Sequence, residues 1–161
     1  MTGLVEELGR RLAAKKAFLA VAESCTGGLI AKKLTDISGS SAWFERGLIT
    51  YSNRSKQELL GVSPQTLADF GAVSRETAEA MARGLLVMTP ADWAVAVTGL
   101  AGPTGGSLEK PVGLVWVAWA RRGHGAESQA FQFAGAREQI REASAEAALA
   151  GLLERVRRAG T

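Results

Sequence analysis

The segment Ala22-Glu23-Ser24-Cys25-Thr26-Gly27-Gly28 lies between an apolar run and a run with helical periodicity, and it is the most informative part of the chain. Residues 17–22 have the pattern of a short buried strand, and residues 28–34 repeat apolar side chains at helical spacing. Where a strand is followed by a helix, unpaired backbone N–H groups and the positive end of the helix dipole favour an anion or a developing oxyanion. Hydroxyl, thiol and glycine residues at such a junction are typical of the position of a nucleophile in an α/β protein.

Length and composition are those of a single globular domain over residues 1–161, with 47% hydrophobic and 22% charged residues. A lone cysteine, Cys25, excludes an internal disulfide and fits a reducing cytoplasm. Together with the lone His124, it also argues against a zinc site. No apolar run approaches the ~20 residues needed to cross a membrane, and residues 1–11 lack the apolar core of a signal peptide.

The net charge of +3 and the pI near 9.4 raise the question of nucleic-acid binding. However, the basic residues are spread along the chain, which is the pattern of solvated helix faces with a basic tail. We therefore expect no nucleic-acid or membrane partner and a small-molecule substrate instead.

Hydrophobic patterning predicts strands that alternate with helices and then two strands in succession, which indicates an α/β fold with a mixed sheet of about five strands. The expected strands are residues 17–22, 43–51, 93–98, 112–120 and 128–133. Helices are expected over residues 5–14, 28–34, 56–60, a short segment from Pro64, 74–88 and 137–158. Asn53 and Ser63 are the expected N-caps of the first two helices between the second and third strands, and Ser74 begins the third.

Three polar segments with glycine or turn residues each follow a predicted strand: Glu23–Gly28, Tyr51–Lys56 and Gly99–Ser107. In an open α/β sheet the crevice beyond the strand ends is the usual ligand site, so these segments are expected to converge there. Taken singly, each of them is also explained as an ordinary turn.

Ser24, Cys25 and Thr26 compete for the role of nucleophile. A reactive cysteine needs a histidine or another cation to hold its thiolate, and otherwise Cys25 is a small buried thiol. Serine needs a base, and Lys56 can act as one if burial or nearby positive charge lowers its pKa. Tyr51 could relay a proton or orient Lys56. The alternative is a surface lysine and an ordinary strand tyrosine.

The glycine-rich segment 99–107 lacks the ending of a Walker motif and does not fit Gly-x-Gly-x-x-Gly, which argues against nucleoside triphosphates. Its backbone N–H groups could still cradle a ribose, a monophosphate or an oxyanion. Arg137 and Arg141 lie one helical turn apart on one face and could hold a phosphate. Solvated arginines are the alternative.

These segments occur together and in order in one known family. They are Ala-Glu-Ser-Cys-Thr-Gly-Gly (22–28), Gly-Ser-Ser-Ala-Trp-Phe-Glu-Arg-Gly (39–47), Tyr-Ser-Asn-x-x-Lys (51–56), Gly-Ala-Val-Ser (71–74), Gly-x-Ala-Gly-Pro-x-Gly-Gly-Ser (99–107) and Pro-Val-Gly (111–113). From about residue 4 to about residue 158 the chain resembles the CinA C-terminal domain family, in its stand-alone form. Two positions depart from the family pattern: Ala136 and Thr104 each stand where an acidic residue is expected.

The resemblance implies an α/β/α sandwich without metal or organic cofactor that hydrolyses the carboxamide of nicotinamide mononucleotide (NMN) to nicotinic acid mononucleotide and ammonia, in bacterial pyridine nucleotide salvage. It implies Ser24 as nucleophile and Lys56 as general base, with Tyr51 beside them. The substrate-binding positions that it implies are Thr26, Gly27, Gly28, Ala101 and Gly102, with Ser41 and Phe44 near the pyridine ring and Arg137 and Arg141 at the phosphate. We also expect a homo-oligomer.

Two other functions stay open. The same amidase site could act on another small carboxamide or ester, or the fold could bind a nucleotide in a regulatory role without hydrolysing it. The joint presence of Ser24, Tyr51 and Lys56 favours hydrolysis, because a binding module has no evident use for that combination.

Overall fold

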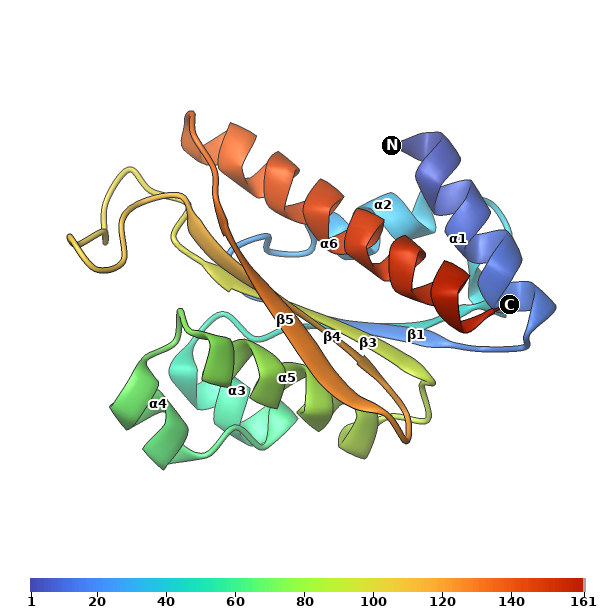
Figure 1. Ribbon diagram of the computed structural model, residues 1–161, viewed down its shortest axis with the longest axis horizontal. Coiled ribbons are helices and arrows are strands. Elements are labelled where there is room, and N and C mark those ends of the chain that lie inside the picture. The colour runs from blue at the N-terminus through green and yellow to red at the C-terminus, as the bar shows by residue number, and fades with distance from the viewer. Residues whose placement is uncertain (161) are drawn as a thin grey trace.

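A five-stranded sheet lies between two layers of helices in the computed structural model, which describes residues 1–160 (Figure 1). The elements in chain order are α1 (Thr2–Ala14), β1 (Leu19–Glu23), α2 (Leu29–Thr35), the 3-10 helix η1 (Ser40–Ala42), β2 (Phe44–Ile49), α3 (Asn53–Leu60), α4 (Pro64–Phe70), α5 (Arg75–Met88), β3 (Trp93–Gly99), β4 (Leu114–Arg121), β5 (Gly125–Gln132) and α6 (Arg137–Ala159). The sheet and helix layers confirm the predicted α/β/α sandwich.

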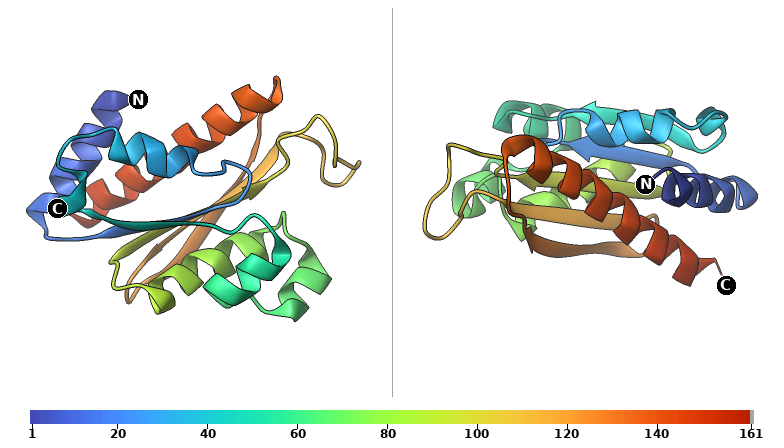
Figure 2. Two further views of the ribbon diagram at one scale, coloured as in Figure 1. Left: turned by 180° about the vertical axis from the view of Figure 1, so that it is seen from behind. Right: turned by 90° about the horizontal axis from the view of Figure 1, so that it is seen from above.

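The sheet has the strand order β2-β1-β3-β4-β5. Strands β2, β1 and β3 run parallel, whereas β4 pairs antiparallel with both β3 and β5. The expectation of a mixed sheet of five strands is therefore confirmed. Helices α1, α2 and α6 cover one face and α3, α4 and α5 cover the other, as the two further views show (Figure 2).

Alternation along the central strands assigns each side chain to one of two cores. Leu19 and Val21 of β1 face the layer of α1, α2 and α6. Ala20 and Ala22 face the opposite layer, in a cluster with Met81 of α5. The small alanines of β1 leave room for α5 to lie close against the sheet.

Local signals explain several of the element bounds, while α1 begins at Thr2, three residues earlier than expected, and the bounds of β1, β2 and β4 shift by one or two residues. Ser63 caps α4 as predicted, and Ser74 caps α5 in the same way, because each hydroxyl accepts a hydrogen bond from the backbone N–H three residues later. Asn53 is not the cap of α3: the Ser52 hydroxyl accepts from the Ser55 N–H, so the helix already begins at Asn53. Strand β5 begins three residues earlier than expected, because Gly125 pairs with Arg121 at the hairpin.

The parallel strands all end at the same edge of the sheet, and this edge positions the candidate site. Strand β1 ends at Glu23, β2 at Ile49 and β3 at Gly99. The β1 ladder continues for one more residue on each side, where Ser24 N–H donates to Val97 O and Thr50 N–H donates to Glu23 O.

None of the helices in residues 1–160 is long and apolar enough to cross a membrane.

Candidate active site

A pocket of about 320 Å³ lies at this edge of the sheet. All three segments that were expected to converge contribute to its lining, which consists of Ser24, Cys25, Tyr51, Lys56, Ala72, Val73, Thr98, Gly99, Leu100, Ala101, Gly102, Thr104 and Arg137. Ala72 and Val73, which precede α5, complete the wall and were not anticipated as site residues.

Ser24 and Lys56 meet in this pocket. Lys56 Nζ lies 3.2 Å from Ser24 Oγ, although the two residues are 32 positions apart. Ser24 is held by its ladder bond to β3, and Lys56 projects from α3, whose first turn is fixed by the Ser52 cap. The distance lies within the range over which a general base can take a proton from a nucleophile.

The lysine is buried, with 1% of its surface exposed. Its other contacts are backbone carbonyls: Nζ donates to Thr50 O at 2.8 Å and to Tyr51 O at 3.3 Å. No carboxylate in residues 1–160 pairs with it. Burial penalises the charged ammonium and lowers the pKa of Lys56 below its ordinary value.

Cys25 also lines the pocket, but its surroundings keep the sulfur protonated. The side chain is buried, and burial raises the pKa of the thiol to about 11. A thiol that stays protonated at neutral pH is a poor nucleophile. The environment therefore favours the alternative of a small buried thiol for Cys25.

Tyr51 contacts Lys56 through its backbone carbonyl rather than through its hydroxyl. Its side chain is 62% exposed, and the hydroxyl accepts a long hydrogen bond of 3.4 Å from Arg137 Nη2. The peptide at residue 51 thus helps to orient the lysine, while the phenol lies at the mouth of the pocket.

The two arginines of α6 differ in their contacts. Arg137 lines the pocket and donates to Gly102 O at 2.8 Å. Arg141 lies one turn further along the helix and donates to the carbonyls of Cys25 and Thr26, at 3.0 and 3.1 Å. The Arg141 guanidinium is therefore used to hold the loop that carries Ser24.

That loop is shaped by its two glycines. Gly27 and Gly28 have φ of +56° and +104°, a region that side chains rarely adopt. Gly27 N–H donates to Ser24 O. The Thr26 hydroxyl is buried and has no hydrogen-bond partner within residues 1–160. These three residues adjoin the pocket through Ser24 and Cys25 but are not among those that line it.

Ala101 and Gly102, in contrast, lie in the pocket wall. Gly102 has a φ of +75°, and a Cβ at this position would collide with the Val112 side chain. Only glycine fits here, which explains one of the glycines in the 99–107 segment.

The structure does not bring Ser41 and Phe44 to the pocket. Phe44 begins β2 and pairs with Leu19, at the amino end of the parallel strands, and Ser41 precedes it in η1. At ~3.3 Å per residue, Phe44 is roughly 16 Å along β2 from Ile49, at whose end the pocket lies. Within this chain, these two positions are separated from the pair of Ser24 and Lys56.

Glu23 was not anticipated as a residue that supports the site. Its carboxylate is buried and accepts hydrogen bonds from the N–H groups of Ile30 and Ala31, at 2.9 and 3.0 Å. These are first-turn N–H groups of α2, so Glu23 occupies the helix end at which an external anion was expected. The signal was a single charged residue at the end of an otherwise apolar strand.

The family model for the CinA C-terminal domain matches residues 1–156. The nicotinamide-nucleotide amidohydrolase PncC of Enterobacter agglomerans is 55% identical over 135 residues, which cover 84% of this chain and 82% of that protein. PncC of Escherichia coli strain K12 is 52% identical over 139 residues, which cover 86% of this chain and 84% of that protein.

A solved structure agrees with the fold. The crystal structure of the competence damage-inducible protein A from Klebsiella pneumoniae superposes with a TM-score of 0.91 at 39% identity, covering 95% of this chain and 94% of that one.

Proposed function

The chain belongs to the CinA C-terminal domain family, and from this premise we propose that it is a nicotinamide-nucleotide amidohydrolase. The reaction is hydrolysis of the carboxamide of NMN to nicotinic acid mononucleotide and ammonia. The observation that carries the proposal is the contact of Ser24 Oγ with the buried Lys56 Nζ, in a pocket large enough for part of a nucleotide. The names of the PncC relatives supply the substrate.

Hydrogen-bond geometry favours Lys56 as the base. A neutral amine has two N–H donors and one lone pair. The carbonyls of Thr50 and Tyr51 can only accept, so they take both donors. The lone pair is then directed toward the Ser24 hydroxyl, which donates its proton to Nζ as Oγ attacks the carboxamide carbon.

The remaining steps follow from this first transfer. Because the Gly27 N–H already donates to Ser24 O, the backbone N–H groups of Thr26 and Gly28 are proposed to stabilise the oxyanion, a contribution of ~3 kcal/mol for each donor in other enzymes. The Lys56 ammonium returns the proton to the departing nitrogen, which leaves as ammonia and gives an ester on Ser24. Water, activated by the same amine, hydrolyses this ester and releases the carboxylate product.

Arg137 is the better candidate for the nucleotide phosphate. It faces the pocket, whereas the Arg141 guanidinium donates to two carbonyls of the loop. Arg137 donates to Gly102 O in the structure, and its planar guanidinium has further N–H groups for phosphate oxygens.

Ammonia release from NMN tests the roles of Ser24 and Lys56. Ser24→Ala and Lys56→Ala should each lower kcat at least ~10³-fold, because each removes a member of the proton-transfer pair. Cys25→Ala is the matched control and should keep most of the activity, since the buried thiol takes no part.

Two outcomes would contradict the assignment. Near wild-type turnover by either Ser24→Ala or Lys56→Ala would remove the residue from the mechanism. Saturable NMN binding by wild-type protein without ammonia release would support the regulatory binding module instead. Comparing NMN with nicotinamide and NAD distinguishes the proposed substrate from other carboxamides.

We further propose that the enzyme acts as a cytoplasmic homo-oligomer in pyridine nucleotide salvage. The reducing compartment is suggested by the single unpaired cysteine. Light scattering coupled to size-exclusion chromatography tests the oligomeric state.

A further inference from the structure

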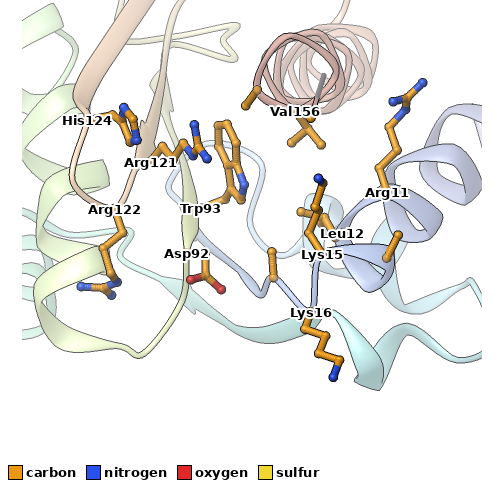
Figure 3. Close-up of a pocket in the computed structure, with 14 residues that line it drawn as sticks. Arg11, Leu12, Lys15, Lys16, Asp92, Trp93, Arg121, Arg122, His124 and Val156 are labelled. Carbon is orange, nitrogen blue, oxygen red and sulfur yellow. The ribbon is translucent and has the colours of Figure 1, made fainter.

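We propose that a second pocket, at the opposite end of the sheet from Ser24, binds a phosphorylated small molecule of about the size of a mononucleotide. This pocket has a volume of about 610 Å³, within the usual range of small-molecule sites. It is bounded by the end of α1, the end of α6, the start of β3 and the β4–β5 turn (Figure 3).

The two pockets are separated by the length of β3. Trp93, at the amino end of that strand, lines the second pocket, and Gly99, at the carboxyl end, lines the first. At ~3.3 Å per residue this separation is roughly 20 Å. A ligand in the second pocket would not contact Ser24 or Lys56.

The lining is strongly basic. It includes five arginine or lysine side chains and His124, against one carboxylate, Asp92. The Asp92 carboxylate accepts a hydrogen bond from Phe18 N–H at 2.8 Å and forms no ion pair with a described residue. The positive charge of the pocket is thus not neutralised from within it.

Some of these cations already have partners. Arg122 donates to the carbonyls at the end of α5, and Arg11 pairs with Glu7. Lys15 and Arg121 form no ion pair within residues 1–160. Figure 3 shows Lys15 extending toward Val156 on the side that faces Trp93, while Lys16 points away.

Arg121 is held in place at the pocket by an aromatic ring. Its guanidinium carbon lies 5.4 Å from the centre of the Trp93 ring, a distance at which a cation and a ring attract each other. Stacking leaves the in-plane N–H groups of the guanidinium available for phosphate oxygens. Trp93 and Val156, which each keep a small exposed surface, form an apolar floor for an organic group, with the buried Leu12 beneath them.

Helix ends explain only part of this charge. Helices α1 and α6 both end at the pocket, and the negative end of a helix dipole attracts cations such as Lys15. Arg121 comes from the β4–β5 hairpin, where no helix ends. Cations from two unrelated elements therefore converge on one cavity, and a dianionic phosphate ester matches their charge.

Calorimetric titration with AMP tests the proposal, with inorganic pyrophosphate as a second probe. Wild-type protein should bind AMP saturably at one site, and binding should weaken as salt rises. The double variant Lys15→Gln/Arg121→Gln should weaken AMP binding at least tenfold. The single variant Lys15→Glu should also weaken AMP binding. Tighter binding of AMP than of pyrophosphate would show that the apolar floor contributes.

The matched control is Lys32→Gln/Arg54→Gln, which removes the same charge from exposed ion pairs on α2 and α3. It should leave AMP affinity unchanged. The absence of saturable binding to the wild type, or AMP binding that persists in Lys15→Gln/Arg121→Gln, would overturn the proposal. An equal loss in the control would also overturn it, because binding would then reflect net charge alone. Lys15→Gln/Arg121→Gln should release ammonia from NMN at the wild-type rate.

Discussion

Lys56 is the residue whose setting most constrains the chemistry. It is among the largest fully buried side chains, and its amine contacts two carbonyls and one hydroxyl. Each contact is compatible with a neutral amine, and burial favours that form. Because burial disfavours the charged ammonium, it favours the neutral amine that the proposed reaction needs as its base.

This setting predicts how activity depends on pH. Since only neutral Lys56 can accept the Ser24 proton, kcat/KM for NMN should rise with pH until the lysine is deprotonated. The midpoint should lie below the ordinary lysine pKa of ~10.4, because burial lowers the pKa. Initial rates of ammonia release across pH measure it. A rate that falls through this range as pH rises would contradict a neutral base.

The same shift has a consequence for stability, with a defined sign. Between the lowered pKa of folded Lys56 and ~10.4, the unfolded chain binds the proton that the folded chain has lost. Folding should therefore become more favourable as pH rises through that window, and Lys56→Met should remove this contribution. Urea unfolding at several pH values measures the difference between the two proteins.

At the scale of the element, α2 begins on a carboxylate from the strand before it. Glu23 accepts from two of its first-turn N–H groups, so strand and helix are joined across the loop that carries Ser24. Gly28, the N-cap residue, has no side chain to offer as a cap. Glu23 takes over that role.

Glu23→Gln should lower the free energy of unfolding by about 1–3 kcal/mol, because hydrogen bonds to a charged group are replaced by weaker ones in a buried place. Glu142→Gln, which removes an exposed carboxylate that pairs with Lys33, should change it by less than ~1 kcal/mol. Urea denaturation of the three proteins checks this. Equal losses for the two variants would show that Glu23 contributes no more than a surface ion pair.

Helices α3 and α5 also depend on a close approach. A Cβ at Gly84 of α5 would collide with the backbone carbonyl of Leu60, at the end of α3. Gly84→Ala should destabilise the fold by at least ~2 kcal/mol and lower kcat, since α3 carries Lys56. Gly3→Ala meets no atom within 4 Å and is the control. Thermal unfolding and NMN turnover of Gly84→Ala measure the two effects. Wild-type values of both the unfolding temperature and kcat would contradict the need for glycine at this position.

Periodicity and the carboxyl-end rule were enough to predict a mixed sheet of about five strands and the meeting of the loops that carry Ser24 and Lys56, whereas the α/β/α sandwich was implied by the resemblance to the family. The place of Phe44 near the pyridine ring was implied by the resemblance alone, and the direction of its strand puts it at the amino edge of the sheet. The contacts that Arg141 and Glu23 make were beyond prediction for another reason. Their partners are backbone groups, which a pattern of side chains does not identify, although a lone charged residue at the end of an apolar strand marked Glu23 as unusual.

At the scale of the whole molecule, two pockets of different charge lie at opposite ends of the strands. The carboxyl ends of the parallel strands hold the pocket with Ser24 and Lys56, and the amino ends adjoin the basic pocket. Helix α6 contacts both, with Arg137 at one pocket and Val156 at the other.

The two arginines of α6 should respond differently to mutation. Arg137→Ala should raise KM for NMN at least tenfold, through loss of a phosphate contact, and should reduce the preference for NMN over nicotinamide riboside. Arg141→Ala should lower kcat instead, through a looser Ser24 loop, and leave that preference intact. Steady-state kinetics with both substrates distinguish these effects. The assignment would be reversed if Arg141→Ala abolished the preference.

The bonds from Arg141 to the carbonyls of Cys25 and Thr26 join parts of the chain that are made at very different times. During synthesis the loop that carries Ser24 is completed early, and more than a hundred further residues must be added before Arg141 is made. Hydrolysis should therefore reach its full rate only after the last helix has docked, so a nascent or prematurely terminated chain would carry both Ser24 and Lys56 and still hydrolyse NMN slowly.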